Sequence, residues 1–147
     1  MAYVTNTDIE ERLGTALYVG LTDDGGTGQP DLDKIVEARD GAEGEANSYL
    51  GRQYAAPVDL SAYPELAAVL KSFVLDLIEF RLHGRRPPVP GVVFQKRQEA
   101  VGWLKKVADG QVVLPAAKVV TESGVRGQTA ATSGRPRVFT RDELADL

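Results

Sequence analysis

The longest densely apolar stretch of this 147-residue chain follows Pro64, and its spacing predicts one long helix that the segment 81–88 ends. Pro64 suits the first turn, because its missing N–H and fixed φ cost nothing there. An apolar stripe at helical spacing comprises Leu66, Val69, Leu70, Phe73, Val74, Leu77 and Ile78. Leu75 and Leu82 project away from this stripe, so the helix needs burial on most sides. Either it is the central helix of a bundle, or part of its surface meets another subunit.

Polar residues on the same helix are confined to a narrow wedge. Ser72, Asp76 and Glu79 share that side, and we interpret them as one polar face. Charged residues also interrupt the apolar stretch, which predicts that the helix does not span a membrane. The first residues carry no basic segment followed by an apolar run, so we expect no secretory signal.

Two helices are predicted before this one. Thr7 followed by Glu10 has the spacing of a capping box, which predicts a short helix that ends at Gly14. Alanines and apolar residues at helical spacing predict a second helix over 31–50. Gly41 weakens that helix, as does Gly44. The small residues either allow another helix to approach closely or face solvent.

A further helix is predicted from about Pro90 to Ala108, closed by Asp109-Gly110. Trp103 lies at the edge of its apolar face, where we expect a core or interface anchor. The predicted fold class is mostly α: a small bundle of about four helices, with a short β segment near residues 112–121. The candidates for a subunit interface are Leu75, Leu82 and Trp103.

The character of the chain changes after residue 114, which predicts a helical domain over 1–114 and a linker with a docking arm over 115–147. Residues 122–134 are rich in Gly, Ser, Thr and Ala and offer little to bury. Apolar residues then return, and the predicted protein-binding residues of the arm are Arg135, Arg137, Val138, Phe139, Arg141, Asp142 and Leu144. The alternative is that this segment packs on its own domain.

The residue types argue against catalysis and against a bound metal. The chain has no Cys and a single His, His83, without nearby carboxylate or nucleophile partners in the sequence. Asp23-Asp24 lie in a Gly-rich loop, but Lys34 stands where a calcium loop beginning at Asp23 needs its final Glu. The glycines of that loop match neither a dinucleotide fingerprint nor a phosphate loop. We therefore expect no catalytic residues, no cofactor and no metal.

A basic cluster, Arg81, Arg85 and Arg86, closes the long helix. Cations suit a helix C-terminus, and Gly84 offers a left-handed cap, so the cluster has a structural explanation. The more specific, functional hypothesis is that the cluster contacts phosphate or DNA. Against it, the net charge of the chain is −4, and non-specific DNA binding needs a surplus of cations.

The chain resembles the small head–tail connector proteins of Mu-like tailed phages along nearly its whole length. The residues that carry the resemblance are Tyr3-Val4-Thr5, Asp8-Ile9, Arg12-Leu13-Gly14, Leu21-Thr22-Asp23, residues 46–54, Pro57, Arg81-Leu82, Pro87-Pro88, Arg97, Glu99-Ala100, Trp103-Leu104, Gly110 and residues 135–142. Gln98 stands where an aromatic residue is expected, and Val89 where an acidic one is common. These departures affect the expected packing of the last helix more than the functional role that the resemblance implies.

The resemblance implies a helical adaptor that binds under the portal, forms a closed ring of typically twelve copies, and offers a platform to a tail-side neck or tail-terminator protein. DNA would pass through the lumen of the ring without sequence-specific binding. An acidic ring fits a conduit that should not grip phosphates. The implied location is the neck of the virion, after assembly in the cytoplasm of the host bacterium. The alternative function is a small nucleic-acid-binding regulator that uses Arg81, Arg85 and Arg86.

Overall fold

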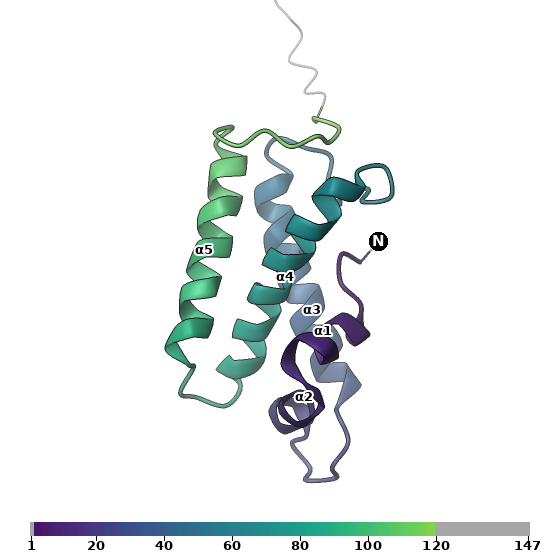
Figure 1. Cartoon of the computed structure of the whole chain (residues 1–147), viewed down its shortest axis with the longest axis vertical. Helices are drawn as coiled ribbons and strands as arrows, with labels where there is room; N and C mark the ends of the chain where they lie inside the picture. Colours follow the sequence, from purple (N-terminus) through teal and green to yellow (C-terminus); the bar gives the residue numbers. More distant parts are fainter. Residues whose placement is uncertain (1, 120–147) are drawn as a thin grey trace, which may run out of the picture.

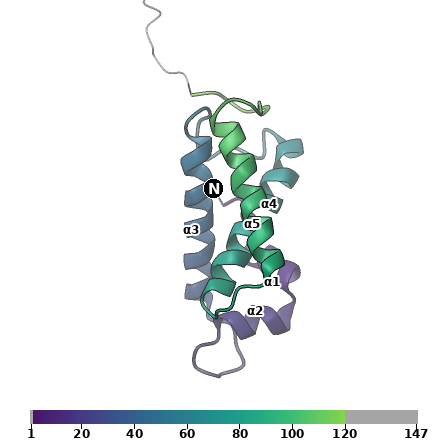
Figure 2. The same cartoon turned by 90° about the vertical axis from the view of Figure 1, so that its left-hand side faces the viewer.

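The computed structural model describes residues 2–119, and this part of the chain folds into five helices. The helices are α1 (Asn6–Leu13), α2 (Thr15–Thr22), α3 (Leu32–Leu50), α4 (Pro64–Gly84) and α5 (Gly91–Ala108). The three long helices α3, α4 and α5 run alternately up and down, and α1 and α2 cover one side near an end (Figure 1). The mostly-α bundle is confirmed. We call the end where α3 and α5 begin the lower end, and the end where residue 119 lies the upper end (Figures 1 and 2).

The N-cap of the first helix lies two residues earlier than predicted. Thr5, and not Thr7, is the N-cap: its hydroxyl accepts the Asp8 N–H, and the Asp8 carboxylate accepts the Thr5 N–H at 2.9 Å. This box is preferred because the Asp8 carboxylate also reaches Lys71 of α4, at 2.5 Å. The capping box predicted at Thr7 and Glu10 is therefore wrong.

Gly14 ends α1, as predicted, and also begins α2. Its φ of +80° is a backbone conformation that favours glycine, and it turns the chain directly into the next helix. The helix α2 was not predicted. It has no side-chain cap, and its buried residues Tyr18, Leu21 and Thr22 form no clear amphipathic pattern in the sequence.

The small residues of α3 serve two different purposes. Ala42 and Ala46 are fully buried, and with Ala38 they let α3 approach α4 and α5 closely. A Cβ at Gly41 would lie 2.9 Å from the Arg81 guanidinium, so that glycine makes room for a side chain of α4. Gly44 is exposed, and a Cβ there would meet no atom within 4 Å.

We expect Gly44→Ala to raise the free energy of unfolding by about 0.5–1 kcal/mol, because alanine loses less backbone entropy than glycine in a helix. Urea unfolding monitored by circular dichroism measures the change. Gly41→Ala is the matched control on the same helix, and its gain should be smaller because Arg81 must move. Equal gains at both positions would contradict this description of α3.

The core lies around α4, which is the central helix of the bundle. Leu70, Val74, Ile78 and Leu82 are each fully buried, and α1, α2, α3 and α5 all contact α4. Its end differs from the prediction. Gly84 is the last residue of the helix and has no positive φ, and Arg85 takes the C-cap in the right-handed region, so the left-handed cap predicted at Gly84 is wrong.

Two tyrosine hydroxyls hold the irregular segments of the upper end. Tyr54 is almost fully buried, and its hydroxyl accepts the Leu114 N–H at 2.7 Å. Tyr3 accepts the Val58 N–H at 2.9 Å in the same way. A single antiparallel bridge joins Tyr54 to Lys118, within the region where a short β segment was predicted; residues 2–119 contain no longer strand. None of the helices in this range combines the length and apolar character needed to cross a membrane.

Candidate functional site

The three residues predicted for a subunit interface lie in or beside the core of this same chain. Leu82 has no exposed surface, and Leu75 is 8% exposed. The reason is that α1 and α2 cover the side of α4 that lies off its main stripe. Trp103 is half-buried and stacks on Phe73 with ring centroids 4.7 Å apart. Leu75 and Leu82 therefore offer little surface to a second copy, and α4 is the central helix of the bundle. The assignment of Trp103 to a subunit interface stays a prediction.

The polar wedge of α4 is covered by basic residues from two other helices. Arg12 of α1 donates to Asp76 and lies 3.7 Å from Glu79, and Lys96 of α5 lies 3.5 Å from Glu79. Burial raises the pKa of Asp76 above its usual range, and the charges of Arg12 and Lys96 partly oppose that rise. Asp76 and Glu79 of the predicted polar face thus belong to a charge network that joins α1, α4 and α5, whereas Ser72 is exposed.

A neighbouring ion pair makes a pH-dependent contribution to stability. Lys71 donates to Asp8, and this hydrogen bond, aided by the Thr5 N–H, lowers the pKa of Asp8 below its usual range. A carboxylate with a lowered pKa stabilises the fold above its unfolded-state pKa, and the contribution is lost as pH falls through the folded-state pKa.

We expect Lys71→Met to cost under about 1 kcal/mol at neutral pH, because Lys71 is 43% exposed and the pair is screened by solvent. The stability difference from the unmodified protein should shrink as the pH falls below about 4, the ordinary pKa of Asp, and disappear as it falls through the lower folded-state pKa of Asp8. Thermal melts at a series of pH values measure this. A difference that stays constant down to the acid limit would argue against the Asp8–Lys71 pair.

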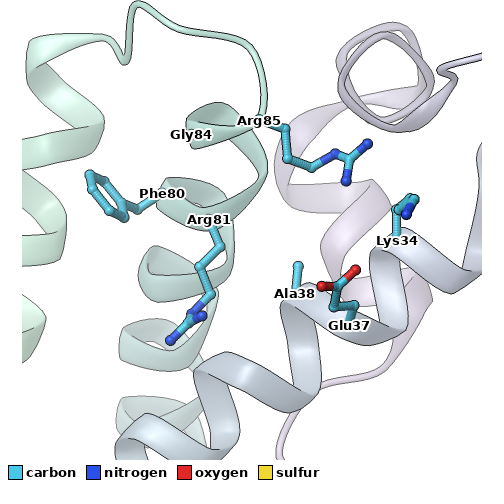
Figure 3. Close-up of a pocket in the computed structure, with 7 residues that line it drawn as sticks. All are labelled: Lys34, Glu37, Ala38, Phe80, Arg81, Gly84 and Arg85. Carbon is cyan, nitrogen blue, oxygen red and sulfur yellow. The ribbon is translucent and has the colours of Figure 1, made fainter.

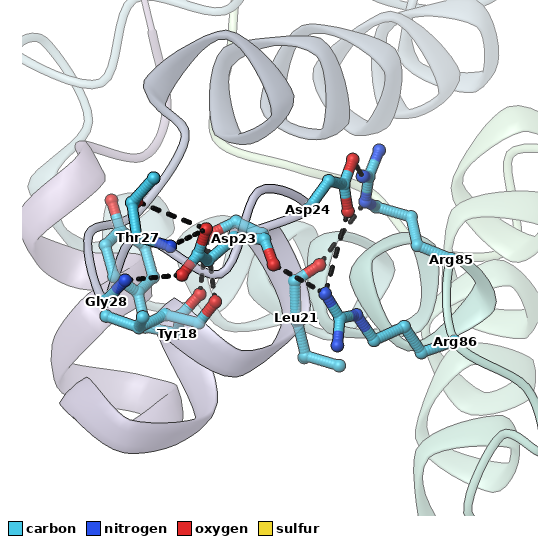
Figure 4. A network of polar contacts seen from close by, with 10 residues as sticks. Tyr18, Leu21, Asp23, Asp24, Thr27, Gly28, Arg85 and Arg86 are labelled. Carbon is cyan, nitrogen blue, oxygen red and sulfur yellow. Dashed lines mark hydrogen bonds and ion pairs between the residues drawn. The ribbon is translucent and has the colours of Figure 1, made fainter.

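All three arginines of the basic cluster are engaged by groups of the same chain, and Figure 4 shows the contacts of Arg85 and Arg86. Arg85 donates to the Asp24 carboxylate and to the Leu21 carbonyl, and Arg86 donates to the Asp23 carbonyl at 2.7 Å. Arg81 pairs with Glu45 of α3 at 2.9 Å. These contacts bind the end of α4 to the loop after α2 and to α3, which favours the structural explanation of the cluster.

The Asp23-Asp24 loop is held by its own backbone. Asp23 accepts the N–H groups of Thr27 and Gly28, at 3.0 and 2.6 Å (Figure 4). These bonds lower the pKa of the Asp23 carboxyl, and the bond from Arg85 lowers that of Asp24. Within residues 2–119, no group of three or more His, Asp or Glu side chains is placed to hold a metal ion.

A groove of about 310 Å³ lies between α3 and α4 at the lower end (Figure 3). Its lining residues are Lys34, Glu37, Ala38, Phe80, Arg81, Gly84 and Arg85. Sequence reasoning singled out the arginines but missed the groove, because its two walls come from segments more than 40 residues apart. The Arg97 guanidinium lies 4.7 Å above the Phe80 ring and extends the basic character toward α5.

Exposed large apolar side chains lie at both ends of the bundle. Toward the lower end they are Leu17 of α2, Leu32 at the start of α3, and Val92 and Phe94 in the first turn of α5. Toward the upper end they are Val69 in the second turn of α4, and Val113 and Val119 after α5. Val92 and Val113 are about two-thirds exposed, at 65% and 69%. Surfaces of this kind are typical of protein contacts, although single exposed apolar residues are common.

The predicted docking arm lies outside the described residues. This holds for all its candidate residues, namely Arg135, Arg137, Val138, Phe139, Arg141, Asp142 and Leu144. The assignment of these residues to protein binding, and the division of the chain at residue 114, stay predictions. The last residue of the described core is Leu114.

The comparisons with known proteins place the chain in one family. Residues 3–131 match the family model described as "Bacteriophage Mu, Gp36". A comparison with curated proteins gave no match. Because the matched range covers most of the chain, this phage protein belongs to the bacteriophage Mu Gp36 family.

Proposed function

We propose that the protein is a structural head–tail connector subunit of a tailed bacteriophage, and that it acts by assembly and catalyses no reaction. Twelve copies form a ring beneath the portal protein, in the neck of the virion, after assembly in the cytoplasm of the host bacterium. A tail-side neck or tail-terminator protein then binds the opposite face of the ring. DNA passes through the lumen without sequence-specific contacts.

The observation that carries this proposal is the family match over residues 3–131, together with the resemblance to connectors of Mu-like phages. The exposed apolar residues at both ends of the bundle support it. An adaptor between two assemblies needs one contact surface toward each of them, and such contacts are built around apolar anchors. The apolar excess of α4 does not support the proposal, because α4 is covered within its own domain.

The electrostatics also favour a conduit over a nucleic-acid-binding regulator. The net charge is −4, and Arg81, Arg85 and Arg86 already have oxygen partners in the described part of the chain. A regulator that used these arginines would have only the N–H donors that these contacts leave free. The DNA affinity of such a regulator would also fall strongly as the salt concentration rises.

The direct experiment removes the predicted arm. We expect a chain that ends at Thr121 to keep its helical domain, because the described core ends at Leu114, but to leave phage heads unjoined to tails. Complementation of a phage that lacks the protein, scored by electron microscopy of heads and tails, measures this. The circular dichroism spectrum and melting temperature of the truncated chain are the controls for folding. Completed virions with the truncated chain would contradict the arm.

A further inference from the structure

The groove between α3 and α4 combines one apolar wall with a basic rim (Figure 3). Phe80 borders the groove with its ring directed toward α5, and Ala38 and Gly84 are the small residues of the lining (Figure 3). The rim carries Lys34, Arg81 and Arg85 against a single carboxylate, that of Glu37, and the net charge of the lining residues is therefore positive. An acidic segment with apolar side chains is the complementary ligand.

The basic groups of the rim keep capacity for another ligand. Arg81 donates to Glu45 through Nη2, and Arg85 donates to Asp24, but each guanidinium has five N–H donors. Lys34 takes part in none of the ion pairs formed within residues 2–119. Lys34 lines the groove, and its ammonium group has three N–H donors that a carboxylate in the groove can accept.

We propose that residues 142–147 of the same chain dock in this groove. The segment carries three carboxylates and no basic residue, at Asp142, Glu143 and Asp146, and its leucines, Leu144 and Leu147, are the apolar partners of Phe80. Docking there occupies the basic rim of the isolated chain. This proposal does not depend on the connector role, because it concerns the isolated chain.

The length of the intervening chain fits docking within one molecule. The groove and residue 119 lie at opposite ends of the bundle, and α3, with 19 residues, spans about 28 Å between those ends. The 22 residues from 120 to 141 can span at most about 75 Å when fully extended, which is more than this separation. A ligand tethered to its own site has a high effective concentration when the tether can span the distance. A segment of the same chain therefore has the advantage over one from another copy.

Disulfide trapping in the full chain tests the proposal, because the sequence has no natural cysteine to compete. Gly84→Cys puts a thiol at the groove without a clash, since a Cβ there meets no atom within 4 Å. Combined with Ala145→Cys, it should form an intramolecular disulfide under mild oxidation, detected as the loss of two hydrogens in the intact monomer mass. The matched control is Gly102→Cys with Ala145→Cys. Gly102 of α5 is equally free of clashes and lies nearer the upper end.

We expect the disulfide of the Gly84 pair to form about tenfold faster than that of the Gly102 pair. Without docking, the opposite order is expected, because Gly102 lies nearer the point from which the tail starts. Lys34→Glu in the Gly84 background should slow closure, and Asp146→Lys in the same chain should restore it. Circular dichroism confirms that each variant is folded. Equal rates for the two pairs, covalent dimers as the main product, or no effect of Lys34→Glu would each overturn the proposal.

Discussion

Replacing Leu82 with alanine is expected to lower the free energy of unfolding by about 3 kcal/mol, the typical cost of emptying a well-packed leucine site. Leu82 has no exposed surface, although in the sequence it lies off the main apolar stripe of its helix. The loss combines the transfer free energy of the removed methine and two methyl groups with the cost of the cavity that remains. Urea unfolding of the isolated protein, at low concentration, measures it.

The control for this prediction is Val69→Ala on the same helix. Val69 is 43% exposed, and its truncation should cost under about 1 kcal/mol. Comparing the two variants tests whether Leu82 is buried within its own domain or is left exposed for a subunit interface. If Leu82→Ala cost no more than Val69→Ala in the isolated chain, Leu82 would not be covered by its own domain, and its assignment to a subunit interface would return.

Arg12→Met is expected to cost about 2 kcal/mol at neutral pH, because it leaves Asp76 nearly buried without its closest cation. Arg12 is about one-third exposed, so the cost is below that of a fully buried pair. Lys96 lies near Glu79 and compensates only part of the remaining negative charge. Urea unfolding at several pH values measures both the cost and its pH dependence.

The pH dependence of this variant has a definite sign. A carboxyl whose folded-state pKa is raised binds protons more readily in the folded chain, so the folded state gains stability as pH falls toward that pKa. Burial already raises the pKa of Asp76, and loss of Arg12 raises it further. The loss in free energy of unfolding caused by Arg12→Met should therefore become smaller as the pH is lowered. Arg12→Met with Asp76→Leu should recover most of the stability, and an additive double variant would contradict the pair.

The three long helices could be predicted from the sequence because their signals are local. The stripe of α4 has a regular period, Asp31 caps α3 with bonds to two N–H groups, and Gly110 takes a positive φ after α5. The two short helices were harder to predict from the sequence. A Thr with an acidic residue three positions later occurs twice near the N-terminus, at Thr5 and at Thr7, and only the contact with Lys71 in the folded chain decides between them.

The features that depend on distant parts of the chain could not be predicted. The sequence shows that Asp76 and Glu79 share a side of α4, but not that Arg12, more than 60 residues earlier, covers them. The groove likewise needs α3 beside the end of α4. The same limit applies to the apolar excess of α4, which suggested a neighbouring subunit until α1 and α2 were seen to cover it.

The mass and rotational symmetry of the species that forms on the purified portal of the same phage test the connector role most directly. Native mass spectrometry gives the number of bound subunits, and electron microscopy of the complex gives its symmetry. The account predicts a closed ring of twelve copies centred on the portal channel. A chain that stays monomeric and leaves the portal unoccupied, or that binds DNA in its place, would contradict it.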